Sequence, residues 1–91
     1  EAAGTRRIKG VSGRLGAFGI TWNWVAPGVI YTDRNTEALS DPEYAKKVTD
    51  QSPARFDGGP RDCAGAAGLL CSDAGRYITG QSLYVDGGKS L

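Results

Sequence analysis

A short apolar run that ends abruptly in Pro27-Gly28 constrains the fold of this chain more than any other feature. The run, residues 20–25, is rich in β-branched and aromatic side chains, and Gly19 precedes it. A run of this kind between turn residues is typical of a short strand that is buried on both faces of a parallel sheet. Ligands of open α/β sheets bind at the carboxyl ends of strands, so the residues after this run are candidates for a binding site.

A second strand is predicted near the other end of the chain. Residues 82–85 are predicted to form this strand, with Thr79-Gly80 before them and Asp86-Gly87-Gly88 after them as turns. Glycine and proline stand where each strand stops, because proline lacks a donor for a ladder and glycine lets a ligand or another backbone approach closely. Gly87-Gly88 is better interpreted as a turn or subunit contact than as a phosphate loop, since no helix follows it.

Two helices are predicted between the strands. Residues 40–43 offer a capping residue ahead of a proline, which predicts a short helix over residues 42–49. Gly58-Gly59-Pro60 begins a second helix that runs to Cys71 and ends within residues 72–75. Residues 63–71 are apolar over most of the helix circumference, as a helix packed into a core requires. Strands and helices in this order predict an α/β fold.

Composition excludes several classes of function. Ninety-one residues form one small domain at most, and 11 basic against 10 acidic residues leave a net charge of +1, too small to predict nucleic acid or an anionic membrane as a partner. The chain has no histidine and only two cysteines, which argues against a metal site and against a Ser-His-Asp hydrolase. No apolar run could span a bilayer or serve as a secretory signal, so the expectation is a cytoplasmic chain.

The two cysteines, Cys63 and Cys71, are expected to be small buried apolar residues. They share roughly one face of the predicted helix but lie two turns apart, which is too far for a disulfide. Free cysteine usually behaves as a small hydrophobe. The basic side chains are scattered and balanced by acidic ones, so they are interpreted as a solvated surface.

The string Asn23-x-Val25-x-Pro27-Gly28-x-Ile30-x-Thr32 resembles the segment beside the nicotinamide in the short-chain dehydrogenase/reductase family. Residues 78–81 and 85–88 agree with the C-terminal motifs of the same family, and the resemblance runs from about Gly16 onward. It implies the C-terminal portion of a Rossmann-like doubly wound parallel sheet, with residues 1–91 forming a single partial domain. It further implies an NAD or NADP cofactor, contacted by Pro27, Gly28, the backbone of Ile30 and the hydroxyl of Thr32.

The resemblance also implies a long helix over residues 1–15, against local chemistry. Gly4, Gly10 and Gly13 each cost about 1 kcal/mol relative to alanine inside a helix. The helix is expected to end near Gly16, in the left-handed position that follows many helices. Trp22 and Trp24 also depart from the family, whose members usually carry smaller residues there. Both indoles point to one face of the strand, where overpacking is expected unless neighbouring structure is missing or has moved away.

The motifs that carry catalysis in the family are not found in this sequence. It has no glycine-rich dinucleotide turn, no Asn-Asn-Ala-Gly segment and no Tyr-x-x-x-Lys pair, since none of its four tyrosines has a lysine four residues downstream. No catalytic residue is therefore predicted, and the chain by itself is expected not to turn over. The 2′ end of the cofactor is normally recognised upstream, so NAD and NADP both stay open.

Two functional hypotheses follow. In the first, the chain is the C-terminal segment of an oxidoreductase that transfers hydride between the cofactor and a small carbonyl or alcohol. Residues 33–53 would then close over a substrate whose identity the sequence leaves open. In the second, the chain is a non-catalytic module that associates with itself, because two strands cannot form a full parallel sheet and leave edges to be paired. Both hypotheses predict a homo-oligomer.

Overall fold

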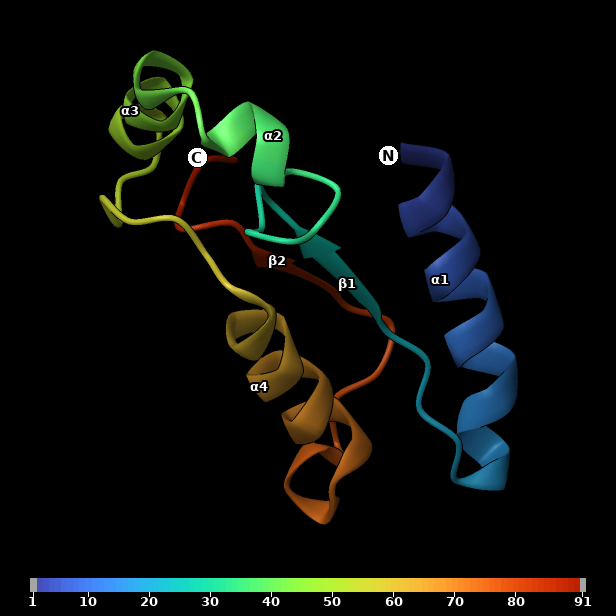
Figure 1. The fold of residues 1–91 in the computed structure, drawn as a ribbon. Coiled ribbons are helices and arrows are strands. Elements are labelled where there is room, and N and C mark those ends of the chain that lie inside the picture. The colour runs from blue at the N-terminus through green and yellow to red at the C-terminus, as the bar shows by residue number, and fades with distance from the viewer. Residues whose placement is uncertain (1, 91) are drawn as a thin grey trace. The chain divides into compact units, whose positions relative to one another are not determined.

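A computed structural model describes residues 2–90 of the chain, and Figure 1 shows its elements. The helices are α1 (Ala2–Leu15), α2 (Thr36–Leu39), α3 (Pro42–Gln51) and α4 (Pro60–Cys71), with 3-10 turns at Gly16–Phe18 and Asp73–Gly75. The strands are β1 (Trp24–Pro27) and β2 (Ser82–Val85). The chain divides into two compact units. The first holds the chain up to Ala26 together with Gly65–Leu83, and the second holds Pro27–Ala64 and the residues from Tyr84 onward.

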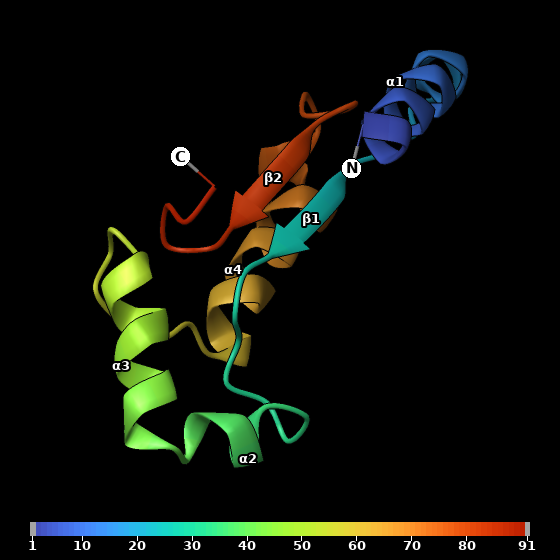
Figure 2. The ribbon, with the colours of Figure 1, turned by 90° about the horizontal axis from the view of Figure 1, so that it is seen from above.

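The two strands form one parallel two-stranded sheet, in which they run side by side in the same direction (Figure 2). The N–H of Trp24 donates to the carbonyl of Gln81 at 2.9 Å, and the N–H of Gly28 donates to that of Val85 at 3.0 Å. The expectation that both strands belong to one parallel sheet is therefore confirmed, and β2 has the predicted bounds. In the first strand the prediction was two to four residues too early, since the strand covers Trp24–Pro27 and not residues 20–25.

Proline does not stop the ladder at Pro27, which corrects a second expectation. The N–H groups of Trp24 and Gly28 point toward β2, so in a strand of period two the missing N–H of Pro27 belongs to the opposite edge. The ladder continues past the proline to Gly28. A proline is compatible with a strand when its N–H side faces away from the partner strand, as it does here.

In the first unit, α1 is confirmed over Ala2–Leu15, whereas Glu1 lies outside the described residues. Its inward face carries Ile8 and Ser12, which are 2% and 7% exposed. Gly16 was predicted to be the left-handed residue after α1, and this prediction was wrong. A 3-10 turn follows α1, and Gly19 with φ +72° ends it by donating to the carbonyl of Gly16 at 3.0 Å.

Gly4 of α1 makes room for one of the two indoles. A Cβ at Gly4 would lie 2.5 Å from the ring of Trp24, so the glycine that appeared to be a liability in a helix lets this ring lie against α1. Both indoles nevertheless stay 46% exposed, and the prediction of a strand buried on both faces was wrong. The described residues place too little structure over this face of β1 to bury two rings.

The Thr79-Gly80 turn fastens the chain before β2 to the chain before β1. The N–H of Trp22 donates to the hydroxyl of Thr79 at 3.0 Å, and the N–H of Gly80 donates to the carbonyl of Trp22 at 2.9 Å. Asn23 adds two bonds, from its Nδ2 to the carbonyl of Ile78 at 2.9 Å and from the N–H of Gln81 to its Oδ1 at 3.1 Å. These side-chain bonds stand where ladder bonds were expected, which explains why β1 begins late.

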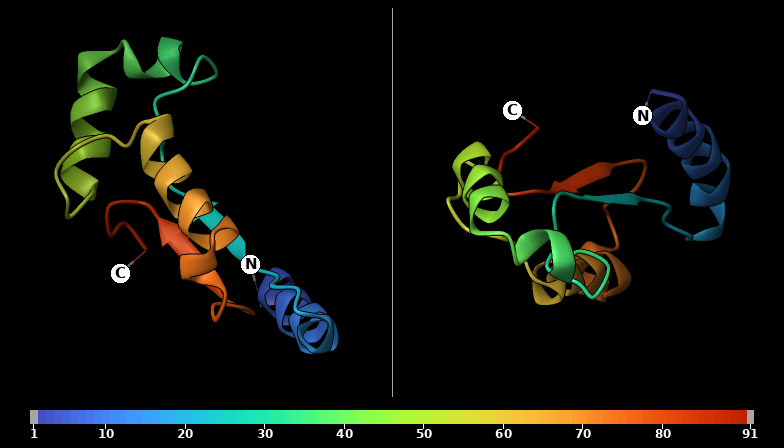
Figure 3. Two further views of the ribbon diagram at one scale, coloured as in Figure 1. Left: turned by 90° about the horizontal axis from the view of Figure 1, so that it is seen from below. Right: turned by 45° about the horizontal axis from the view of Figure 1, so that its top comes forward.

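In the second unit, α2 leads into α3 at Ser40-Asp41 (Figure 3). Asp41 is the N-cap of α3, accepting a bond from the N–H of Glu43 at 3.0 Å, and Pro42 occupies the first turn. The predicted helix over residues 42–49 is thus confirmed and extends to Gln51. The short helix α2 was not predicted, because four residues give no periodic signal.

Helix α4 is confirmed, but its predicted burial was wrong. Asp62 lies in its first turn and accepts a bond from the N–H of Gly59 at 2.7 Å, in the manner of a capping box. No described residue of α4 is buried, Cys63 is half-buried and Cys71 is exposed. The described residues cover its apolar surface only in part, leaving Cys63, Ala66 and Leu70 half-buried. Among those residues, no helix is both long enough and apolar enough to cross a membrane.

Candidate functional site

The bend after β1 is held by the end of β2. A Cβ at Gly28 would lie 2.7 Å from the Cβ of Asp86 and 2.9 Å from its Cα. Real side chains do not approach so closely, so only glycine fits at this position without a shift of the backbone. The sequence left open whether a ligand or another backbone requires Gly28. The structure gives that place to the backbone of Asp86.

Ile30 is oriented by a parallel bridge with Gly58. The bridge uses the N–H of the following residue, Tyr31, which donates to the carbonyl of Gly58 at 2.8 Å. In a parallel bridge the N–H and C=O of the bridged residue itself face the other way. The side chain of Ile30 reaches Gly58, where an added Cβ would lie 3.0 Å from its Cδ1. The amide groups of Ile30 are therefore directed away from Gly58.

Thr32 lies in a tight turn that begins α2. Its carbonyl accepts bonds from the N–H of Asn35 at 2.9 Å and from the hydroxyl of Thr36 at 3.1 Å. Nδ2 of Asn35 donates to the carbonyl of Ile30 at 2.7 Å. The hydroxyl of Thr32 is exposed and has no hydrogen-bond partner within residues 2–90. Two polar groups of this turn have no hydrogen-bond partner within residues 2–90, the outward N–H of Ile30 and the Thr32 hydroxyl, while the Ile30 carbonyl accepts only the bond from Asn35.

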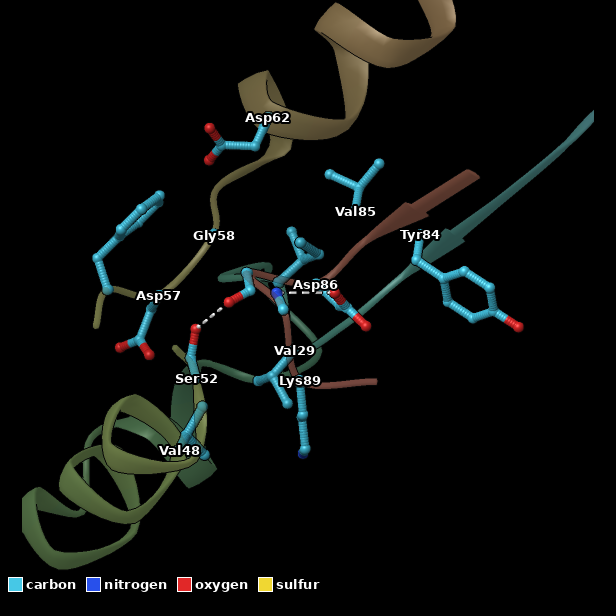
Figure 4. Close-up of a pocket in the computed structure, with 14 residues that line it drawn as sticks. Val29, Val48, Ser52, Asp57, Gly58, Asp62, Tyr84, Val85, Asp86 and Lys89 are labelled. Carbon is cyan, nitrogen blue, oxygen red and sulfur yellow. Dashed lines mark hydrogen bonds between the residues drawn. The ribbon is translucent and has the colours of Figure 1, made fainter. Parts of the chain in front are cut away.

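A cavity of about 280 Å³ begins beside the bend, inside the second unit (Figure 4). Asp57 and Asp62 lie on one side of it and Tyr84 on the other (Figure 4). Of the four residues predicted to contact a cofactor, Ile30 lines this cavity and Pro27, Gly28 and Thr32 do not. The cavity lies on the Gly58 side of the Ile30 segment, whereas the N–H and carbonyl of Ile30 face away from Gly58. The cavity and the predicted cofactor contacts are therefore different places.

The turn after β2 holds the C-terminal end of α3. The hydroxyl of Ser52, which is 6% exposed, donates to the carbonyl of Gly87 at 3.2 Å, and the N–H of Ala54 donates to the same carbonyl at 2.9 Å. Gly87 has φ +63°, and a Cβ there would collide with the Ser52 hydroxyl. The Asp86-Gly87-Gly88 motif thus has a structural role, as the interpretation of it as a turn predicted.

Hydrogen bonds hold the pKa of Asp86 below its ordinary value. The largest contribution is a hydrogen bond from the Ser90 side chain, and the N–H groups of Gly88 and Ser90 donate to the two carboxylate oxygens at 2.9 and 3.0 Å. Bonds that favour the charged form of a carboxyl group lower its pKa. The ionised carboxylate therefore stabilises the turn that lies against Gly28.

Asp86→Asn is expected to lower the free energy of unfolding at neutral pH, because the amide cannot accept both backbone bonds. A carboxyl group whose pKa is lower in the folded than in the unfolded state contributes stability above its unfolded pKa, and that stability disappears as the pH falls through the folded pKa. The difference in free energy of unfolding between the wild type and Asp86→Asn should therefore become smaller in acid. Urea unfolding of both proteins over a pH series measures it, and a gap of constant size would contradict this role of Asp86.

The sequence did not predict the bond from Asn35 to Ile30, nor the bonds by which Asn23 joins the segments before β1 and β2. Asparagine at a turn often bonds to nearby backbone, which would have marked Asn35 as a candidate five residues after Ile30. For Asn23 the only signal was its place in the family string, because its partners lie 55 and 58 residues away along the chain. The roles of Pro27, Gly28, Ile30 and Thr32 toward a cofactor remain predictions.

Comparison with known proteins extends the resemblance to nearly the whole chain. A family model described as enoyl-(acyl carrier protein) reductase matches residues 2–90. L-Rhamnose 1-dehydrogenase (NAD(P)(+)) of Azotobacter vinelandii is 50% identical over 74 residues, which are 81% of this chain and 29% of that protein. 7α-Hydroxysteroid dehydrogenase of Escherichia coli K12 is 38% identical over 88 residues, 97% of this chain and 34% of that protein. The chain thus spans about a third of the length of these relatives.

Solved structures agree with the sequence matches. A blue fluorescent protein from a metagenomic library, in complex with NADPH, superposes with a TM-score of 0.86 at 39% identity, over 99% of this chain and 35% of that one. A 4-hydroxyisoleucine dehydrogenase complexed with NADH gives a TM-score of 0.90 at 28% identity, over 98% and 37%. The fold is accordingly the α/β Rossmann-like type, of which this chain covers part. The chain belongs to the short-chain dehydrogenase/reductase family.

Proposed function

We propose that this chain forms one wall of the nicotinamide site of an NAD(P)-dependent oxidoreductase. The observation that carries the proposal is the arrangement after β1, where the outward amide edge of Ile30 and the unused hydroxyl of Thr32 follow the carboxyl end of a parallel strand. A nicotinamide carboxamide has one acceptor and two donor hydrogens, and a backbone amide edge with a hydroxyl offers matching groups. Solved relatives with bound NADH and NADPH support the same cofactor class.

The residues of the bend would hold the cofactor in complementary ways. Ile30 would bond the carboxamide through its backbone, and Thr32 would reach the carboxamide or the pyrophosphate through its hydroxyl. Pro27 and Gly28 would shape the bend, since Gly28 is already fixed against Asp86. When bound, the cofactor supplies or accepts the hydride for a carbonyl or alcohol substrate. The protein's part here is to orient the ring, and residues 33–53 would limit which substrate reaches it.

Thr32→Val is expected to weaken the binding of NADH about fivefold, because one hydrogen bond to the ligand is lost while the shape of the side chain is kept. Tyr31→Phe is the matched control, since it removes a hydroxyl from the neighbouring exposed residue. Calorimetric titration of the wild type and both variants measures the three affinities. Equal losses in both variants, or no loss in Thr32→Val, would count against the proposed role of Thr32.

A second function, self-association without catalysis, is favoured by the exposed apolar side chains of the first unit. Phe18 is 77% exposed and Ile20 47% exposed, on a part of the chain that also carries the two half-exposed indoles. The edge of β1 that faces away from β2 is unpaired within the described residues, and such edges promote association. Sizing chromatography separates the monomer from an assembly. An assembly that binds no nucleotide would favour this second function over the first.

A further inference from the structure

Asn35 stands at the start of α2 but does not cap it. Asparagine is favoured at this position because its side-chain oxygen accepts a bond from an N–H of the first helical turn. In this chain the Asn35 side chain forms no cap bond. Its Nδ2 turns back along the chain and donates to the carbonyl of Ile30 at 2.7 Å, in a half-buried setting. The side chain is thus committed to the Ile30 segment and not to its own helix.

The backbone of Asn35 closes the same turn. Its N–H donates to the carbonyl of Thr32 at 2.9 Å, and its carbonyl accepts the N–H of Leu39, also at 2.9 Å. Leu39 is 7% exposed and forms part of the buried apolar core. Asn35 therefore connects the Ile30–Thr32 segment to a buried anchor. Gly58 fixes that segment from its other side through the bond from Tyr31 at 2.8 Å.

We infer that Asn35 is a positioning residue for the nicotinamide, acting through the backbone of Ile30. The inference rests on the proposed function and adds a residue to it. A carbonyl oxygen has two lone pairs, so Ile30 can accept from Asn35 and still accept from a cofactor carboxamide. The bond from Asn35 fixes the direction of that carbonyl before the ligand arrives. A preorganised site binds more tightly because less order has to be imposed on binding.

Asn35→Asp separates this role from helix capping. Aspartate is as good an N-cap residue as asparagine, and its charge is favourable at a helix N-terminus. Its carboxylate cannot donate to Ile30, however, and it would repel the carbonyl oxygen. A residue that matters only as a cap would tolerate this exchange. If Asn35 is a positioning residue, the exchange to aspartate should weaken ligand binding. The weakened contacts should be those to the nicotinamide end of the ligand.

The experiment is a titration of the ¹⁵N-labelled chain with reduced nicotinamide mononucleotide, which lacks the adenosine half of the cofactor. In the wild type we expect shifts at the amides of Ile30 and Thr32. In Asn35→Asp we expect affinity weakened about fivefold or more, which corresponds to one lost hydrogen bond at the site. We also expect faster exchange of the Tyr31 amide hydrogen, with unchanged protection in Ser82–Val85.

Four outcomes decide between the possibilities. Equal affinity and exchange in Asn35→Asp and wild type would overturn the inference and leave the proposed function intact. No response of Ile30 or Thr32 in the wild type would contradict the proposed function and the inference with it. If the amides of Ser82–Val85 lose their protection from hydrogen exchange in Asn35→Asp, that variant is disturbed beyond the site. Asn35→Ser is then measured in its place, since serine also caps helices. Global unfolding of both variants would overturn the inference, because Asn35 would then be required for folding itself.

Discussion

Gly28→Ala is expected to lower the free energy of unfolding by about 1–3 kcal/mol, the usual range for forcing extra volume into a filled space. The added Cβ would lie 2.7 Å from the Cβ of Asp86 and 2.9 Å from its Cα. The Asp86 Cα belongs to the backbone at the end of β2, so relief requires the two strands to separate there. The bond from the N–H of Gly28 to the carbonyl of Val85 would be strained by the same movement.

Gly13→Ala is the matched control for that variant. Gly13 lies inside α1 on its exposed face, and a Cβ there meets nothing within 4 Å. Alanine is better than glycine in a helix interior, so Gly13→Ala should raise the free energy of unfolding by up to about 1 kcal/mol. Urea unfolding of the wild type and both variants gives the two differences. A Gly28→Ala variant as stable as Gly13→Ala would show that Asp86 does not lie against Gly28.

Asn23→Ala is expected to cost about 2 kcal/mol of stability. The substitution leaves two groups without their partner, the carbonyl of Ile78 in a half-buried setting and the N–H of Gln81 in an exposed one. A polar group that loses its partner away from water costs more than the net worth of the bond. Thermal unfolding should show a lower midpoint, with the loss centred on the turn before β2.

Asn23→Asp gives a sharper version of the same test. Its carboxylate can still accept from Gln81 but cannot donate to Ile78, so the variant should be destabilised at neutral pH. A protonated aspartate regains a donor, and part of the loss should therefore be recovered in acid. Unfolding midpoints of Asn23→Asp that fall in acid as steeply as those of the wild type would contradict the assignment of the bond between Asn23 and Ile78.

Local sequence patterns predicted several elements well. β2 was predicted with its observed bounds because turn residues stand on both sides of Ser82–Val85. The start of α3 followed from the cap and proline at Asp41-Pro42. The placement of both strands in one parallel sheet followed from the resemblance to a family, and the bonds at Trp24 and Gly28 confirm it. These features depend on neighbours along the chain or on a long motif.

Features that depend on distant partners were predicted poorly. β1 begins at Trp24 because Trp22 and Asn23 bond to residues 78–81, far along the sequence. Gly4 was counted as unfavourable for a helix, because its contact with the ring of Trp24 could not be predicted from the sequence. The burial of Cys63 and Cys71 was predicted from the usual behaviour of free cysteine, whereas Cys63 is half-buried and Cys71 is exposed. At the site, the identity of Gly28 was predicted, but its contact with Asp86 was not.

In the proposed function, a nicotinamide ring lies against the turn that follows β1. Intermolecular nuclear Overhauser effects between the protons of reduced nicotinamide mononucleotide and the labelled chain measure this contact directly. We expect effects from the nicotinamide protons to Ile30 and to the Thr32 methyl group, with none to Tyr84 in the 280 Å³ cavity. Effects confined to Tyr84 and its neighbours, or none at Ile30 and Thr32 at saturating ligand, would contradict the account.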